Sequence, residues 1–326
     1  MNISLLLTNI LQPPVLFFGL GLAAIVSRAR LEIPSSLVKA MSLYFLLAIG
    51  FKGGVELRAS GLTPLVMLEM LAAIGMACAI PVWTFFVARR TLDTANAAAV
   101  AATYGSVSAV TFIAATSFLD TLKVTHGGHM VAAMALMEAP AIIVGLALAR
   151  KFGAMNTEAG GKGDWKEVLQ DAFLNGSVFM LAGSFVIGLL TGEAGRAALN
   201  PFTGDIFKGV LCLFLLEMGL MAGKKWTELK GVGAFPLVWG QCAPPMHAAL
   251  ALGLAYALRM PPGDALLLTI LGASASYIAV PAAMRIALPE ANPGLYVSMA
   301  LAITFPFNLL VGMPLYYTAI HVLWRR

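Results

Sequence analysis

The amino-acid sequence predicts an all-α membrane protein: ten transmembrane helices in a 5+5 inverted repeat, with broken, crossing helices 4 and 9. Three observations support this prediction. First, 60% of the 326 residues are hydrophobic and only 11% are charged, whereas soluble domains carry about 25% charged residues. Second, four short motifs recur in the same order in the two halves of the chain. Third, Gly and paired Ser residues interrupt two long apolar segments.

The predicted spans are apolar segments long enough to cross a bilayer as a helix, which takes roughly 20 residues. They cover residues 8–27, 37–54, 62–88, 95–119, 128–151, 175–192, 205–223, 231–258, 264–287 and 295–323. Several contain Pro or Gly, which membrane helices tolerate because neighbouring groups satisfy the freed backbone. The lipid membrane is therefore an expected partner, and the scattered basic residues do not indicate nucleic acid.

Lys and Arg residues predict the orientation of these spans. Thirteen of the 21 lie in or beside odd-numbered loops, and eight lie in or beside even-numbered loops or at the C-terminus. Because Lys and Arg are enriched on the cytoplasmic side, we predict cytoplasmic odd loops and both termini outside. The polar fifth loop, MNTEAGGKGDWKEVLQD, divides the chain. We therefore predict a first repeat at 1–151, a cytoplasmic linker at 152–174 and a second, inverted repeat at 175–326.

The two halves resemble each other at offsets of 166 to 172 residues. The paired motifs are FLLAIGFKGG at 45–54 and FLLEMGLMAG at 214–223, LTPLV at 62–66 and AFPLV at 234–238, SVS at 106–108 and SAS at 274–276, and EAP at 138–140 and TFP at 304–306. Each unit has five spans, so the second must enter the membrane from the opposite side. Many secondary transporters have this inverted architecture.

The stretches YGSVSAVTFIAA and LGASASYIAVPAA place Gly and Ser inside spans 4 and 9. Gly accepts unusual backbone angles, and Ser caps a new helix start, so each stretch predicts a break followed by a half-helix. Freed N–H groups carry a partial positive charge and are tolerated in a membrane where they line a site. We predict that the two breaks meet and hold a small anion. The alternative is that Gly and Ser only permit close helix packing.

The motifs GSVSAVTFIAA, LLEMGLMAG, MEAPA, ASASYIAVPAAMR and TFPFNLLVGMPLYY resemble the sodium-dependent bicarbonate transporter family known from cyanobacteria. The resemblance runs from residue 50 to residue 317. It implies a sodium-dependent symporter that takes up bicarbonate through an elevator-type movement, forms a homotrimer and lies in a bacterial inner membrane. It also implies a gate domain of helices 1, 2, 6 and 7, a core domain of helices 3–5 and 8–10, no enzyme activity, and no cofactor other than sodium as coupling ion.

This resemblance places bicarbonate and sodium where spans 4 and 9 cross. The family motif falls on eight residues, which are the predicted substrate-binding set: Gly105, Ser106, Val107, Ser108, Ser274, Ala275, Ser276 and Tyr277. Sodium is a hard cation that prefers oxygen ligands, and we predict it at Glu138, Ser106, Ser276 and Asn308. Glu138 is the strongest candidate, since carboxylates inside spans are costly and usually functional.

Two departures from the cyanobacterial pattern concern acidic residues. Glu138 and Glu217 stand where that pattern has Asp, so the charge is kept and the side chain is longer. The central loop is also shorter than in the cyanobacterial proteins. This shortness argues against regulation by a PII-like partner.

Other titratable residues are predicted to be structural. Glu69 and Glu217 are expected in buried pairs or hydrogen bonds, and His247 as a buried histidine with its hydrogen bonds satisfied. His126 and His129 in HGGH lack the i, i+4 spacing of a helical zinc pair and are predicted to lie in an outer loop without a metal.

Three alternative functions compete with bicarbonate symport. A sodium symporter of another small carboxylate, in the broader bile-acid-symporter-like group, stays open, as does a passive anion channel. An intramembrane enzyme is disfavoured, because no histidine belongs to a Ser–His pattern and neither HExxH nor paired catalytic aspartates occur.

Overall fold

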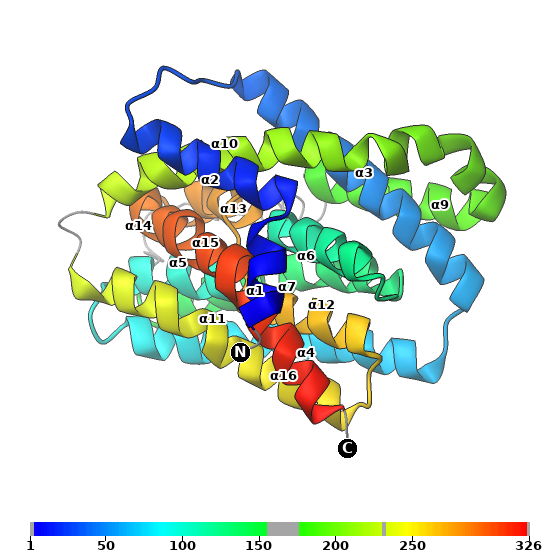
Figure 1. The fold of residues 1–326 in the computed structure, drawn as a ribbon. Helices are drawn as coiled ribbons and strands as arrows, with labels where there is room; N and C mark the ends of the chain where they lie inside the picture. The colour runs from blue at the N-terminus through cyan, green and yellow to red at the C-terminus, as the bar shows by residue number, and fades with distance from the viewer. Residues whose placement is uncertain (1–2, 155–175, 230–232, 325–326) are drawn as a thin grey trace.

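The structure is a computed structural model that describes residues 3–154, 176–229 and 233–324 (Figure 1). Every regular element within these ranges is a helix, which confirms the all-α prediction. The predicted linker lies outside the described residues except for 152–154.

The first half contains α1 (Ile3–Ile10), α2 (Pro13–Val26), α3 (Ser35–Ser60), α4 (Pro64–Ala88), α5 (Thr94–Gly105), α6 (Ala109–Leu122) and α7 (His129–Lys151). The second contains α9 (Gly176–Asn200), α10 (Phe207–Glu228), α11 (Ala234–Ala257), α12 (Pro262–Ala273), α13 (Ala279–Ala287), α14 (Pro293–Ser298), α15 (Phe305–Phe307) and α16 (Met313–Leu323). Short π-helical segments cover Pro201–Asp205, Met299–Thr304 and Asn308–Gly312.

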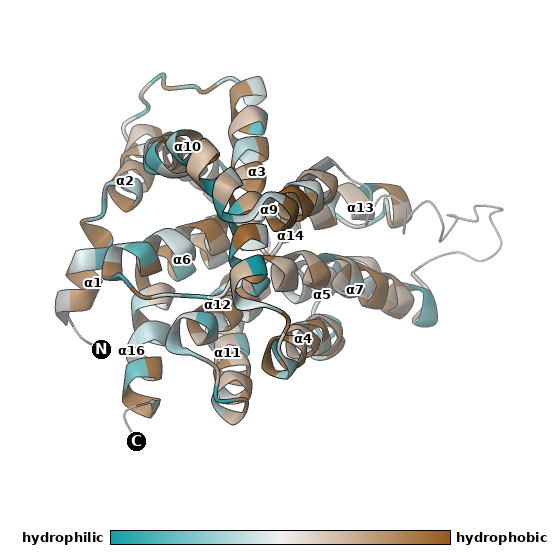
Figure 2. Cartoon of the chain, turned by 90° about the vertical axis from the view of Figure 1, so that its right-hand side faces the viewer, coloured by the Kyte–Doolittle hydropathy of each residue, from teal (hydrophilic) through white to brown (hydrophobic). Residues whose placement is uncertain are grey.

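Six helical segments among the described residues are long and apolar enough to cross a membrane: Ser35–Ser60, Pro64–Ala88, Thr94–Leu122, His129–Lys151, Val178–Trp226 and Pro293–Leu323. Hydrophobic residues recur along helices such as α3 and α4 (Figure 2). The chain is therefore a multi-pass membrane protein. The count of ten spans and the inverted relation of the halves remain predictions.

The helices form two packed groups. In the first, α2 lies against α10 and α3 lies against α9 (Figure 1). In the second, α4 packs against α5 and α7, and α11 packs against α12. In the segment that contains α5 and α6, 94% of an 18-residue apolar window is buried within the protein, so this segment is mainly an interior element.

Glycine residues bring the helices of the first group close together. A Cβ atom at Gly21 of α2 would lie only 2.8 Å from the backbone nitrogen of Leu220 in α10. A Cβ atom at Gly54 of α3 would lie 2.7 Å from the backbone nitrogen of Leu189 in α9. Small residues at such crossings let two membrane helices approach until their backbones touch.

The end of α9 differs from the predicted span 175–192. The helix continues to Asn200, with a kink at Gly192, whose φ of 58° and ψ of −144° are not helical. The guanidinium of Arg58 donates to the carbonyl oxygens of Leu189 (3.2 Å) and Leu190 at this kink. A positive side chain thus satisfies carbonyl groups that the interrupted helix leaves free.

Candidate functional site

The structure interrupts the helix at both Gly-Ser stretches, as predicted. α5 ends at Gly105 and α6 begins at Ala109, while α12 ends at Ala273 and α13 begins at Ala279. Ser108 is the N-cap of α6, and its Oγ accepts a hydrogen bond from the backbone N–H of Thr111 at 3.2 Å.

The two breaks contact each other in the interior. The backbone N–H of Ser276 donates to the carbonyl oxygen of Thr103 at 2.8 Å. The backbone N–H of Ser108 donates to Oγ of Ser274 at 3.0 Å, and this hydroxyl donates to the carbonyl oxygen of Leu271 at 2.9 Å. Two of the N–H groups expected to bind the anion are therefore already used within the protein.

Both glycines at the breaks make room for α4. A Cβ atom at Gly105 would lie 2.5 Å from Cδ of Pro81, and one at Gly272 would lie 2.5 Å from Cε of Met76. Neither glycine has a positive φ. Our expectation that they provide unusual backbone angles is therefore wrong, and their role is to let α4 approach both breaks.

A cavity of about 50 Å³ lies between the breaks. Its walls come from α3 and α10 on one side and from α6, α7 and the second break on the other. The lining residues are Ser42, Phe45, Leu46, Val107, Ser108, Ala109, Val110, Ile113, Glu138, Phe214, Ser276, Tyr277, Ile278 and Ala279.

Half of the predicted substrate-binding set lines this cavity. Val107, Ser108, Ser276 and Tyr277 do so. The lining does not include Gly105, Ser106, Ser274 or Ala275, which are all buried. Of these four, Ser274 joins the two breaks and Gly105 lets α4 approach the first break.

Two lining residues of the cavity were not among the predicted site residues. Ala109 and Val110 line it and belong to the first turn of α6. N–H groups in a first helical turn have no intrahelical carbonyl partner and carry the positive end of the helix dipole. Their apolar side chains gave no signal in the sequence, and only their position after the Ser108 cap could have indicated them.

Glu138 projects into the same cavity from α7. Its Oε2 atom is buried and has no hydrogen-bond partner among the described residues. Glu138 and Ser276, two predicted sodium ligands, are thus brought to one cavity. A carboxylate oxygen with no partner in the protein is free to bind a cation or to accept a hydrogen bond from a ligand.

Three buried hydroxyl groups near the first break also have no partner among the described residues. They belong to Thr103, Ser106 and Thr111. Ser106 was a predicted sodium ligand, whereas the two threonines were missed. Hydroxyl groups buried without a partner are unfavourable, so this group of oxygens suits a bound cation.

Asn308, the remaining predicted sodium ligand, does not line the cavity. Its Nδ2 donates to the carbonyl oxygen of Ala273 at 2.8 Å, and its Oδ1 accepts from the hydroxyl of Tyr316 at 3.2 Å. Asn308 thus satisfies a carbonyl group at the end of α12, where the break leaves it without a helical partner.

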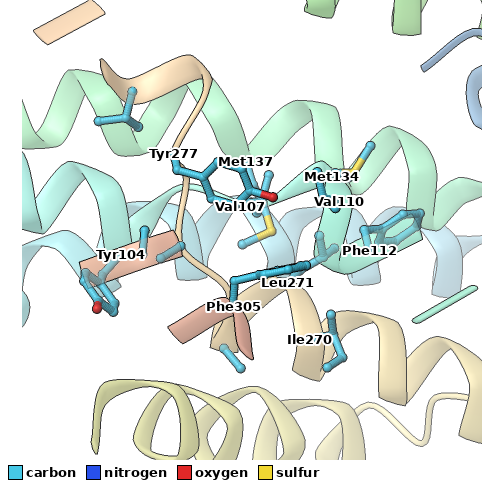
Figure 3. Close-up of a cluster of buried hydrophobic side chains, with 14 of the residues drawn as sticks. Tyr104, Val107, Val110, Phe112, Met134, Met137, Ile270, Leu271, Tyr277 and Phe305 are labelled. Carbon is cyan, nitrogen blue, oxygen red and sulfur yellow. The ribbon is translucent and has the colours of Figure 1, made fainter. Parts of the chain in front are cut away.

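Tyr277 connects the second break to the other helix group. Its hydroxyl donates to Sδ of Met218 in α10 at 3.7 Å. Figure 3 shows its ring reaching toward Val107 and Met137 in the interior. Tyr277 therefore lines the cavity and links the second break to α10.

A larger cavity of about 660 Å³ adjoins the first one. The two share Ser42, Phe214, Tyr277, Ile278 and Ala279. The larger one extends to the start of α3 and is also lined by Glu217. A third cavity, of about 170 Å³, lies toward the other end of α3 at Lys52 and Glu56, and it shares no lining residue with the first.

Two other titratable residues take part in buried contacts. Glu69 forms a buried pair with His129, as expected. Nε2 of His247 accepts a hydrogen bond from Nε1 of Trp83 at 3.0 Å, while Nδ1 of His247 has no partner among the described residues. The prediction of a fully satisfied histidine is therefore only partly met.

A comparison with protein families matches the Na⁺-dependent bicarbonate transporter superfamily over residues 13–321. The chain belongs to this superfamily. The match covers nearly the whole chain and confirms the resemblance found in the sequence motifs. A search of curated proteins finds no matching sequence.

Membership of the Na⁺-dependent bicarbonate transporter superfamily identifies the chain as a transporter. This agrees with its apolar helices and with a small interior cavity between two broken ones. Bicarbonate and sodium are the substrates that fit the superfamily.

Proposed function

We propose that the protein is a sodium-dependent symporter that takes up bicarbonate and binds the anion between the two helix breaks. The observation that carries this proposal is the cavity of about 50 Å³ between α6 and the second break, with Glu138 in its wall. Helix starts attract anions through their free N–H groups. The donors proposed at this site are the N–H groups in the first turn of α6 and the hydroxyls of Ser108 and Ser276.

The size of the cavity favours a small anion. A volume of about 50 Å³ has room for roughly four water-sized groups. Bicarbonate consists of one carbon and three oxygens, so it fits such a space. The alternative, a bulkier carboxylate, would have to extend from this space into the adjoining larger cavity.

Charge balance explains why sodium would accompany the anion. Glu138 and bicarbonate are both negative in a poorly hydrated interior, where like charges repel strongly. A cation beside them offsets this repulsion and much of the desolvation cost. The oxygens proposed for sodium are those of Glu138, Ser276 and Ser106, together with the unpartnered hydroxyls of Thr103 and Thr111. Oδ1 of Asn308 is a further candidate, although it already accepts a hydrogen bond from Tyr316.

The arrangement of the cavities supports alternating access. The large cavity opens from the start of α3, which the predicted topology places in the cytoplasm, and it joins the proposed anion site. The cavity at the other end of α3 shares no residue with that site. A passive channel needs a continuous path, whereas access from one side at a time suits an elevator-type symporter.

We propose that the helices behind the breaks form the moving core and that α2, α3, α9 and α10 form the gate.

The hydrogen bonds between the breaks support the inverted repeat. In the proposed alignment, Thr103 corresponds to Leu271, and Ser108 corresponds to Ser276. Ser276 N–H reaches the Thr103 carbonyl directly, and Ser108 N–H reaches the Leu271 carbonyl through the Ser274 hydroxyl.

The homotrimer and the bacterial inner membrane are proposed from the family resemblance alone, and the external termini from the distribution of Lys and Arg.

A competition experiment separates bicarbonate from other carboxylates. Sodium-driven uptake of labelled bicarbonate into proteoliposomes should be inhibited weakly by formate and acetate, and not at all by a bile acid. Inhibition that grows with the size of the carboxylate would favour the bile-acid-symporter-like alternative.

A further inference from the structure

A second buried polar cluster lies at the starts of three helices, away from the proposed anion site. It consists of Glu69 near the start of α4, His129 at the start of α7 and Asp264 in the first turn of α12 (Figure 1). The three residues are only 1%, 3% and 4% exposed. One ligand atom from each lies within 4.8 Å of the other two.

The surrounding chain fixes these side chains in place. Nε2 of His129 contacts Oε2 of Glu69, and Oδ1 of Asp264 accepts a hydrogen bond from the backbone N–H of Gly127 at 2.5 Å. A Cβ atom at Gly128 would lie 2.6 Å from Cβ of Glu56. The two glycines of the HGGH motif thus let the loop before α7 pack closely, which holds His129 next to two carboxylates from other helices.

We propose that Glu69, His129 and Asp264 bind one divalent transition-metal cation, for which Zn²⁺ is the best candidate. Zn²⁺ takes imidazole nitrogen and carboxylate oxygen ligands at about 2.0–2.2 Å, and three protein ligands leave a fourth position for water. The three donor atoms lie within 4.8 Å of one another, and the Glu69 and His129 side chains would have to rotate apart to admit the cation between them. Sodium, calcium and magnesium prefer oxygen-only ligand sets, so the histidine makes this site different from the proposed sodium site.

Charge balance favours a divalent cation over a proton. Two carboxylates and a protonated imidazole leave one negative charge in a buried position, which is unfavourable. Two carboxylates, a neutral imidazole and a divalent cation sum to zero. His126 is the other titratable side chain near Asp264, and its Nδ1 has no partner among the described residues.

Solvent can reach the neighbourhood of the cluster. The cavity of about 170 Å³ is lined by His126 and Val131, which stand on either side of His129 in the chain. It shares no lining residue with the proposed anion site. A metal at the cluster would join α4, α7 and α12, so we expect it to stabilise the fold and not to take part in anion binding.

Metal binding to the full chain tests the proposal directly. The purified protein in detergent is stripped with EDTA and then loaded with Zn²⁺, and the bound metal is measured by mass spectrometry after gel filtration. We expect one equivalent per chain, an affinity order of Zn²⁺ above Mn²⁺ above Mg²⁺ and Ca²⁺, and an unfolding temperature about 5 °C higher at saturating Zn²⁺.

Two variants distinguish this site from adventitious binding. His129→Gln should lose the bound equivalent, whereas His321→Gln, which removes an exposed histidine of α16, should keep it. Substoichiometric Zn²⁺ in the wild type would overturn the proposal, whatever the fate of the variants. Equal Zn²⁺ binding by wild type and His129→Gln would also overturn it. A third outcome would also overturn it: His129→Gln lowers the unfolding temperature, but Zn²⁺ has no effect on the wild type. The cluster would then be a structural group held by the His129–Glu69 pair without a metal.

Discussion

The backbone N–H of Ser108 donates to the hydroxyl of Ser274 at 3.0 Å, and this contact joins the two breaks. Because the same hydroxyl donates to the Leu271 carbonyl at 2.9 Å, Ser274→Ala leaves a buried donor and a buried acceptor unpaired. We expect it to lower the free energy of unfolding by about 1–3 kcal/mol and to impair uptake. Thermal unfolding in detergent and uptake assays measure the two effects.

The matched control for this variant is Ser106→Ala, at the corresponding position of the first half. The Ser106 hydroxyl has no partner among the described residues, so its removal should leave the unfolding temperature nearly unchanged. If it is a sodium ligand, the sodium concentration for half-maximal uptake should rise. A large loss of stability in Ser106→Ala, equal to that in Ser274→Ala, would contradict this assignment.

Gly105 tests the close approach of α4 to the first break. In Gly105→Ala the new methyl group would lie 2.5 Å from Cδ of Pro81, and overpacking of this kind costs about 1–3 kcal/mol. Gly75→Ala on α4 is the control, since a Cβ atom there meets nothing within 4 Å. We expect the control to be neutral or stabilising by up to about 1 kcal/mol. Equal unfolding temperatures for the two variants would contradict a close contact between Gly105 and Pro81, because the first break would then accept a methyl group without cost.

Glu138→Gln separates sodium binding from anion binding. The variant keeps the shape of the side chain and removes its charge. A hydrogen bond or ligand contact of a charged group contributes about 1.5–3 kcal/mol, so the apparent sodium affinity should weaken about tenfold or more. Anion affinity at saturating sodium should change less. Intact sodium dependence with lost anion affinity would place Glu138 in the substrate site instead.

Glu138→Asp tests the departure from the cyanobacterial pattern. Glu138 reaches the cavity from its present position on α7, so a shorter side chain should withdraw the carboxylate from it. We expect reduced uptake although Asp is native to the cyanobacterial relatives. Full activity in this variant would show that the position of the carboxylate within the cavity is not critical.

Asp93 makes the start of α5 sensitive to pH. Partial burial raises the pKa of Asp93, but hydrogen bonds from the backbone and side chain of Asn96 outweigh it and hold the pKa below its usual value. Because the folded-state pKa is lowered, the ionised carboxylate stabilises the fold above the unfolded-state pKa of about 4. This contribution is lost as the pH falls through the folded-state value. Asp93→Asn should therefore be less stable than wild type at pH 7, and this difference should shrink as the pH falls through the folded-state pKa of Asp93. A constant difference in unfolding temperature would contradict this.

Hydrophobicity, and the Gly and Ser residues that interrupt apolar segments, were enough to predict the helices and the two breaks from the sequence. Apolar runs indicated membrane helices, and the two breaks lie where Ser108 and Ser274 suggested. Helix ends were harder, because α9 passes through Gly192 with the help of Arg58, a contact between distant segments that hydropathy does not encode.

The candidate site was predicted only in part, for a similar reason. Sequence identifies residue types, whereas the cavity wall depends on how five segments meet. Ala109 and Val110 line the cavity, and their apolar side chains gave no signal of this in the sequence. Asn308 looked like a free amide but is used to satisfy Ala273. His129 looked isolated until the fold placed Glu69 and Asp264 beside it.

Sodium-gradient-driven uptake of radiolabelled bicarbonate into proteoliposomes tests the central claim most directly. The account predicts accumulation that requires inward-directed sodium, is abolished when the gradient is collapsed, and shifts to higher sodium concentration in Glu138→Gln. Bicarbonate flux of equal size with and without sodium, unchanged in Glu138→Gln, would contradict coupled transport and would favour a passive anion channel.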